Sequence, residues 1–277
     1  MWTAFRSVQS ALRLRREDYM PEKELLRDVG AVNREFYDSL YRIGPSWLSA
    51  LRALTSFDQQ SKAKPNFVAA RELVAGKAAT SSKLRILDYG AGWGTFLLKW
   101  PTGTAVCWCY DISRESVRQC LSAGRLLRRE ITEWSGSGGQ FDLVCCSHVL
   151  EHVPDDIALL RRLGGITRPG GIVLLNVPIN EVWEDPKHVR RYESKSLRSV
   201  IEAAGLVGVF EREGDRISTF LLKRERAARM GRFEKAALRM LRLMFAFTPY
   251  RILLWLDSNA FAKHAPSQLI VGARNGA

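Results

Sequence analysis

Three glycines, Gly90, Gly92 and Gly94, occupy alternate positions in the segment LDYGAGWGTFL, directly after a hydrophobic run. Glycines at this spacing allow a ligand to lie against the backbone, and a helix expected to begin near Thr95 would add unpaired N–H groups. The pattern differs from the dinucleotide-binding sequence G-x-G-x-x-G, whose third glycine would fall at Thr95. The segment therefore predicts a small-molecule site that is not the usual dinucleotide site.

Acidic residues stand at the ends of the first two expected strands, Asp88 in the glycine segment and Asp111 in the segment CYDIS. A carboxylate at Asp88 would repel a phosphate group and attract an ammonium or sulfonium group. Asp111 is placed to accept hydrogen bonds from two ribose hydroxyls. Together these residues favour a positively charged nucleoside over NAD or ATP.

Histidines form a second group of candidates. In SHVLEHVPDD, His148, Glu151 and His152 stand at i, i+3 and i+4, and His188 follows the fifth expected strand. One alternative is a general base that removes a hydroxyl proton near neutral pH, with His188 as the first candidate and His148 and His152 as the others. A second alternative is a divalent metal bound by Glu151, His152 and His188. A third is a purely structural network.

The elements that must position these residues alternate between short hydrophobic strands and amphipathic helices. We expect strands at 84–88, 106–111, 126–131, 141–147, 172–177, 206–210 and 268–273, with helices at 113–124, 155–163 and 194–204 among others. Continuous apolar strands separated by helices predict a parallel sheet that is covered on both faces. In such a sheet, ligands bind beyond the carboxyl ends of the strands, which is where Asp88 and Asp111 stand.

Four segments in order, LDYGAGWGTFL, CYDIS, FDLVCCSHVLEHVPDD and ITRPGGIVLLNVP, resemble the motifs of class I S-adenosylmethionine-dependent methyltransferases, and QLIVGAR resembles their last strand. The resemblance implies an α/β fold: a Rossmann-like, doubly wound, seven-stranded, mostly parallel sheet with an antiparallel last strand. It also implies S-adenosylmethionine as cofactor. The residues that it assigns to the cofactor are Asp88, Gly90, Ala91 and Gly92 for the methionine part, Asp111 for the ribose, Ile112, Glu130 and Ile131 for the adenine, and Ser147 at the end of the fourth strand.

The histidine segment, Pro178 and DPKHVRRYESKSLRSVIEAAGL are similar to the branch of this family that methylates sugars, quinone precursors and other metabolites. This similarity implies O-methylation of a hydroxyl on a small molecule, a sugar or a lipid-linked intermediate. One alternative is a 2′-O-methyltransferase acting on RNA: the net charge of +13 permits it, but no RNA-binding motif accompanies the domain. Another is a catalytically silent, membrane-associated scaffold.

Helical segments flank the expected core on both sides. The expected organisation is a helical extension over 1–80 with breaks near Gly44-Pro45 and Lys64-Pro65, a core over 81–222, a helical insertion over 223–262, and the last strand with a tail over 263–277. The insertion combines arginines with an apolar stripe. It is therefore a candidate for a lid, a homodimer contact or a contact with an anionic membrane.

Cysteine usage and the first residues bear on the compartment. The five cysteines form no Cys-x-x-Cys pair, which indicates buried, reduced thiols in a cytoplasmic protein rather than a zinc or redox site. Residues 1–16 are amphipathic and rich in arginine, a pattern shared by mitochondrial presequences and by surface helices of bacterial proteins.

Overall fold

The computed structural model of the protein describes residues 22–42, 47–75, 83–181, 185, 187–226, 231–260 and 266–275. The arginine-rich residues 1–16 and the expected break at Gly44-Pro45 lie outside these ranges. Strands pair in the order β3-β2-β1-β4-β5-β7-β6 to form one seven-stranded sheet. Their bounds are β1 (Leu84–Tyr89), β2 (Ala105–Tyr110), β3 (Ile131–Glu133), β4 (Phe141–Ser147), β5 (Thr167–Ile179), β6 (Leu206–Gly214) and β7 (Ser267–Asn275). Among the described strands, β7 pairs antiparallel with both β5 and β6, and all other pairs are parallel.

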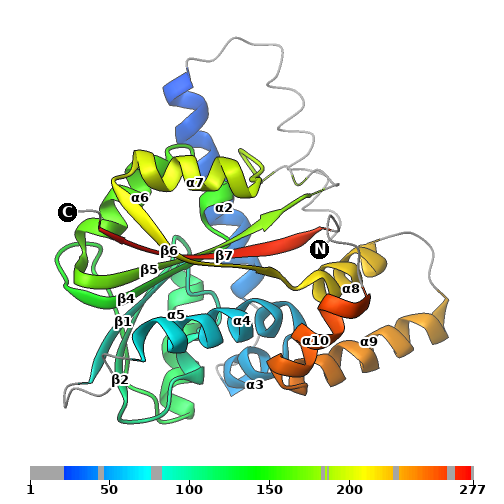
Figure 1. Ribbon diagram of the computed structural model, residues 1–277. Helices are drawn as coiled ribbons and strands as arrows, with labels where there is room; N and C mark the ends of the chain where they lie inside the picture. Colours follow the sequence, from blue (N-terminus) through cyan, green and yellow to red (C-terminus); the bar gives the residue numbers. More distant parts are fainter. Residues whose placement is uncertain are drawn as a thin grey trace.

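Helices cover both faces of the sheet (Figure 1). The helices α6 (Asp156–Gly165) and α7 (Ser194–Ala203) lie on one side, and α4 (Phe57–Val74) and α5 (Arg114–Leu126) lie on the other. Each face encloses its own hydrophobic core, with Leu160 and Leu197 in one and Ala69 and Cys120 in the other. The expected doubly wound α/β fold with an antiparallel last strand is confirmed.

The first described helices, α2 (Glu22–Tyr41) and α3 (Trp47–Thr55), pack on α5, whereas α4 packs directly on β4, β5 and β7. Helix α4 therefore belongs to the layer of helices that covers the sheet, although it lies within residues 1–80, which were expected to form an extension. The break expected at Lys64-Pro65 is wrong, because Pro65 lies inside α4. Proline removes one backbone N–H from a helix, and burial of this helix against the sheet offsets that loss.

Two elements near the expected site also differ from expectation. The third strand covers Ile131–Glu133 rather than 126–131, because Leu126 belongs to the last turn of α5. After β1 the chain forms no α-helix near Thr95 but a single 3₁₀ turn, η1 (Leu97–Lys99). Pro101 explains the short turn, since a residue before proline is driven to an extended conformation and Trp100 has ψ 130°.

Three helices separate β6 from β7 and project from one end of the sheet (Figure 1): α8 (Arg216–Arg226), α9 (Arg232–Phe247) and α10 (Tyr250–Ala260). A small hydrophobic cluster joins them to α4, and the Lys64 ammonium donates to the carbonyls of Phe245 and Thr248 at the end of α9. Among the described helices, none has both the length and the apolar character needed to cross a bilayer. The five cysteines are buried and unpaired, as expected.

Packing of the first glycine turn gives a test of this fold. Gly94 has φ +77°, and a Cβ atom there would lie 2.5 Å from Sγ of Cys120 on α5. Gly103 has φ +84° with nothing within 4 Å of that position. We expect Gly94→Ala to lower the free energy of unfolding by about 3 kcal/mol and Gly103→Ala by about 1 kcal/mol, because both strain the backbone but only the first overpacks. Urea denaturation measures both, and equal losses would contradict the packing.

Candidate active site

A cavity of about 1440 Å³ lies at the carboxyl ends of β1, β2, β4 and β5. Its walls are the glycine turn after β1, the segments that follow the other strands, and one side each of α2 and α4. Seven of the nine expected cofactor-binding residues line it, namely Asp88, Gly90, Ala91, Gly92, Asp111, Ile112 and Ser147. The three candidate histidines, His148, His152 and His188, line the same cavity. The sheet therefore brings both predicted groups together.

The carboxylate of Asp111 holds the glycine turn against the start of α5. Its Oδ2 atom accepts from the backbone N–H of Gly92 at 3.0 Å, and its Oδ1 atom accepts from that of Ser113 at 3.0 Å. The backbone N–H groups of Gly90 and Ala91 both donate to the carbonyl of Tyr110, at 2.7 and 3.0 Å. These bonds hold the glycine turn in place where it faces the cavity, although no long helix follows the turn.

Asp88, at the end of β1, is buried in the cavity wall. Burial and the nearby Asp111 raise the pKa of its carboxyl to about 8. Burial also raises the pKa of Asp111, although the hydrogen bonds from Ser113 and Gly92 act in the opposite direction. A cationic ligand beside these groups would favour their ionised forms, so its binding should strengthen as they lose protons.

These residues fit S-adenosylmethionine, the cofactor that the resemblance implies. Asp88 and Asp111 offer carboxylates to a positive group and to ribose hydroxyls, and the buried hydroxyl of Ser147 has no hydrogen-bond partner among the residues that the structure describes. A side chain at Gly90 would overlap that of Val149, so the turn must stay free of side chains there. The lysines and arginine that line the cavity come from α4, α9 and the segment after β5, away from the glycine turn. The turn is thus suited to a cationic nucleoside rather than to a phosphate.

Two of the expected adenine contacts are corrected by the structure. Glu130 lies outside the cavity lining, is exposed and pairs with Lys83 at 3.4 Å. Ile131 packs beside Gly124 of α5 and also lies outside the lining. The cause is the displaced third strand: Glu130 precedes β3, so neither residue stands at its carboxyl end.

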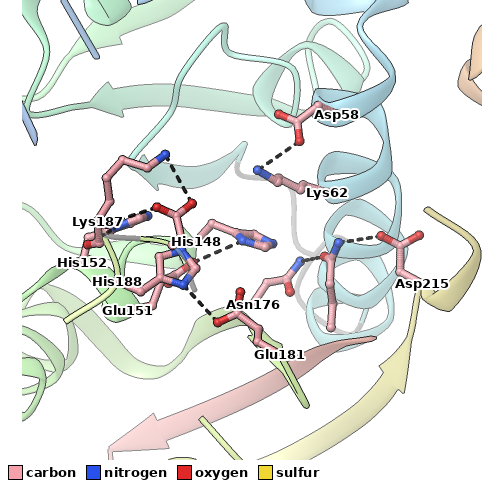
Figure 2. A network of polar contacts seen from close by, with 12 residues as sticks. Asp58, Lys62, His148, Glu151, His152, Asn176, Glu181, Lys187, His188 and Asp215 are labelled. Atoms are coloured by element: carbon pink, nitrogen blue, oxygen red, sulfur yellow. Dashed lines mark hydrogen bonds and ion pairs between the residues drawn. The ribbon is translucent and has the colours of Figure 1, made fainter. Parts of the chain in front are cut away.

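His188 is paired with a carboxylate that the sequence did not single out. Its Nδ1 atom lies 3.0 Å from Oε2 of Glu181, and both residues line the cavity (Figure 2). Burial lowers the pKa of His188, but the hydrogen bond that its ring donates to Glu181 and the charge of Glu151 outweigh this effect and raise the pKa above its ordinary value. In the neutral form of the ring, Nδ1 donates to Glu181 and the Nε2 atom carries the lone pair.

His152 packs against His188, with ring centroids 4.8 Å apart. Its Nδ1 atom lies 3.0 Å from the carbonyl of Lys187, and its Nε2 atom lies 3.3 Å from the hydroxyl of Tyr37 on α2. Both ring nitrogens therefore have partners. Burial lowers the pKa of His152, so it is neutral at neutral pH.

The half-buried His148 pairs with the buried Glu151, with 3.2 Å between Nδ1 and Oε1 (Figure 2). The expected helical face is reduced to one 3₁₀ turn, Leu150–His152, and His148 precedes it with φ +54°. Burial acts to raise the pKa of Glu151, but His148 and His152 lower it to about 2. The contact with the His148 ring contributes most to this lowering of the pKa, and the charges of His148 and His152 add to it. A non-glycine residue at positive φ is often found at a functional site.

The expected metal alternative has a structural counterpart. Glu151, His152 and His188 each offer a ligand atom, and these atoms lie within 4.8 Å of one another. Two ligands of one zinc ion, each bonded at about 2.0–2.1 Å, can be no more than about 4.2 Å apart. In the observed arrangement the Nδ1 atom of His152 and that of His188 are already engaged by Lys187 and Glu181. The side chains would have to move inward to bind an ion.

Helices α2 and α4 contribute residues that sequence reasoning missed. Tyr37 and Tyr41, one helical turn apart on α2, line the cavity, and the ring of Tyr41 lies 5.0 Å from that of Trp93 beside the glycine turn. From α4 come Asp58 and Lys62, which form an ion pair at 3.4 Å. The four-residue spacing of the tyrosines indicates that they share one face of a helix, but it does not show which part of the protein that face contacts.

Comparison with known sequences shows the family to which the chain belongs. Residues 58–210 match a family model described as a methyltransferase domain. The trans-aconitate 2-methyltransferase of Azoarcus sp. strain BH72 is 31% identical over 127 residues, which is 43% of this chain and 48% of the relative. The ubiquinone biosynthesis O-methyltransferase of Ralstonia nicotianae is 28% identical over 165 residues, 56% of this chain and 65% of the relative. The chain thus spans about half the length of the first curated relatives that it matches.

Solved structures agree on the fold. Magnesium protoporphyrin IX methyltransferase from Synechocystis PCC 6803 with bound cofactor superposes with a TM-score of 0.53 at 13% identity, over 89% of this chain and 97% of that one. The [4+2]-cyclase SpnF superposes with a TM-score of 0.50 at 18% identity, over 74% of this chain and 79% of that one. At these identities the likeness concerns the fold alone. Because the family model covers more than half of the 277 residues, the chain belongs to the class I S-adenosylmethionine-dependent methyltransferases.

Proposed function

We propose that this methyltransferase acts on a hydroxyl oxygen of a small molecule, a sugar or a lipid-linked intermediate, with His188 as general base. The observation that carries the proposal is the His188–Glu181 pair in the cavity that also holds Asp88 and Asp111. A histidine oriented by a carboxylate is the usual form of a general base. A hydroxyl acceptor needs such a base, because its proton must leave as the new bond forms.

The size of the cavity supports a small acceptor. Pockets for single ligands usually measure about 300–1,000 Å³, and this cavity measures about 1440 Å³. It therefore has room for an acceptor beside the cofactor. Helix α2 covers one side and is held by Lys187, whose ammonium lies 4.5 Å from the ring of Phe36. Cover on this side limits the access of water, which would otherwise compete with the acceptor hydroxyl for the methyl group.

The proposed chemistry assigns a distinct role to each buried group. When bound, S-adenosylmethionine supplies the electrophilic methyl group. The Nε2 atom of His188 accepts the proton of the acceptor hydroxyl, and the Glu181 carboxylate stabilises the resulting imidazolium. His152 is less suited to this task because Tyr37 already occupies its Nε2 atom. Alignment of the acceptor contributes up to about 7–11 kcal/mol, and a general base about 10²- to 10⁴-fold in rate.

Cofactor binding is expected to depend on the two carboxylates. We predict that Asp88→Asn and Asp111→Asn each weaken the binding of S-adenosylmethionine by about 10- to 100-fold, the usual loss for a charged hydrogen bond. Glu130→Gln is the matched control, since Glu130 is exposed and lies outside the cavity. Calorimetric titration measures all three. A loss with Glu130→Gln as large as the other two would contradict the assignment.

The raised pKa of Asp88 predicts how this binding varies with pH. Below a pKa of about 8 the carboxyl is mostly protonated in the free protein, so a cation must displace its proton. The affinity difference between the unaltered protein and Asp88→Asn should therefore widen from pH 6 to pH 8. Titrations at several pH values measure the difference. A constant difference would show that Asp88 does not change its charge on binding.

Turnover is expected to depend on His188 and on the charge of Glu181. We predict that His188→Ala lowers kcat by about 10²- to 10⁴-fold while cofactor affinity stays unchanged. Glu181→Gln should lower kcat less and move the acidic limb of the pH profile to lower pH, because the carboxylate holds the pKa of His188 above its ordinary value. Methyl transfer from labelled cofactor to a panel of sugars and phenols measures both effects.

The metal alternative gives a different result in the same assay. If a divalent ion activates the acceptor, a chelator abolishes turnover and an added divalent ion restores it. His152→Ala would then reduce turnover as strongly as His188→Ala, because both would be ligands. Under the general-base proposal, turnover resists the chelator and His188→Ala has the larger effect.

A further inference from the structure

Helix α9 turns an apolar face away from the protein. Its inner face, with Leu238, Phe245 and Ala246, packs toward the core. Phe233, Met240, Leu243, Met244 and Phe247 recur at helical spacing on the opposite side and are all exposed, Phe233 to 92%. We call these five residues the outer face of α9. Monomeric soluble proteins rarely expose so many large apolar side chains in one place, and such a face usually binds a partner or a membrane.

The next helix along the chain, α10, also exposes large apolar side chains. Trp255 and Ile252 on α10 are exposed, Trp255 to 64%, and α10 directly follows α9 through Thr248 and Pro249. The orientation of α9 is fixed, because the Lys64 ammonium donates to the carbonyls of Phe245 and Thr248 at 3.0 and 2.7 Å. The outer face therefore cannot turn inward without breaking these bonds to α4.

The charges beside the outer face are positive. Arg232, Lys235 and Arg239 lie on its flank, and Arg251 is exposed on α10. The acidic residues of α9 and α10 are Glu234, which bonds the N–H of Gly231, and Asp257, which is buried beside Arg216. A second copy related by a two-fold axis would bring these like charges together, and among the described residues of α9 and α10 only Glu234 is an exposed acidic partner. A surface that is both apolar and negatively charged complements this face better.

We propose that the outer face of α9, together with Trp255 and Ile252 of α10, docks the protein on an anionic membrane leaflet. The apolar side chains enter the boundary between headgroups and acyl chains while the flanking basic residues contact anionic headgroups. Tryptophan prefers this boundary because its ring is apolar and its N–H is polar. The docking needs no cofactor and no turnover, so it stands apart from the proposed reaction.

The test is co-sedimentation of the full chain with lipid vesicles. We expect binding to vesicles with about 30% phosphatidylglycerol and much weaker binding to pure phosphatidylcholine, at about 0.1 M salt. Raising the salt to about 1 M, where the screening length falls to ~3 Å, should remove most of the binding. Equal binding to both kinds of vesicle, or none to the anionic ones, would overturn the proposal.

Two double variants locate the surface. Met244→Ser with Phe247→Ser should weaken vesicle binding by at least about tenfold, since two large side chains no longer enter the leaflet. Arg232→Glu with Arg239→Glu should weaken binding to the anionic vesicles by a similar factor and leave the weak binding to neutral ones unchanged. If both variants still bound the vesicles as the unaltered protein does, the assignment to α9 would be overturned.

The matched control is Val207→Thr with Val209→Thr, which alters two exposed apolar residues of β6, away from α9. It should bind vesicles as the unaltered protein does, and equal unfolding temperatures of the variants would show that each is folded. Light scattering of the unaltered protein tests whether a second copy of the chain covers the outer face of α9 instead of a membrane. A dimer that Met244→Ser with Phe247→Ser converts to a monomer would overturn the membrane proposal in favour of self-association.

Discussion

Asp88 and Asp111 are held in a wall of the cavity where burial raises the pKa of both carboxyls. Neutral side chains at these two positions would have avoided the free-energy cost of burying a carboxylate. Instead the two carboxyls stand at the ends of neighbouring strands, with Asp111 also bonded to the turn that approaches the ligand. A nearby positive group strongly stabilises the ionised form of such buried acids, because the attraction between opposite charges is strong where water is scarce. The arrangement thus favours a cation and provides nothing for a phosphate at the turn.

The opposite wall of the cavity depends on a chain of buried amides. Asn176 of β5 donates to Asn66 of α4 at 2.8 Å and to Gln268 of β7 at 2.9 Å, and Gln268 donates to Asp215 at 2.6 Å (Figure 2). Burial raises the pKa of Asp215 well above its ordinary value. Buried polar groups that satisfy one another fix a single arrangement of the elements that carry them. Here they fix α4, and α4 in turn supports both the cavity and α9.

The chain resembles both a methyltransferase and a cyclase in fold, so the fold alone does not decide the reaction. The segments outside the strands must supply the side chains that do. The sheet and the glycine turn form the part of the cavity where we expect the cofactor. The His188–Glu181 pair and the tyrosines of α2 come from segments outside the strands, where chains of one fold differ most. The chemistry proposed here therefore depends on a few side chains that reach one cavity from distant parts of the chain.

The sequence by itself determined a mostly parallel sheet covered on both faces and placed most of the expected cofactor-binding residues at one edge of it. Strand periodicity and the turn after β1 are local properties, so Asp88, Gly92 and Asp111 could be assigned without knowing their neighbours. Glu130 was misplaced because the short, weakly apolar β3 begins after it, and local pattern cannot locate such a strand precisely. The tertiary structure alone decided the partners across the cavity. Glu181 orients His188, α2 covers the site, and Pro65 remains inside a helix, because packing between distant segments outweighs local preference.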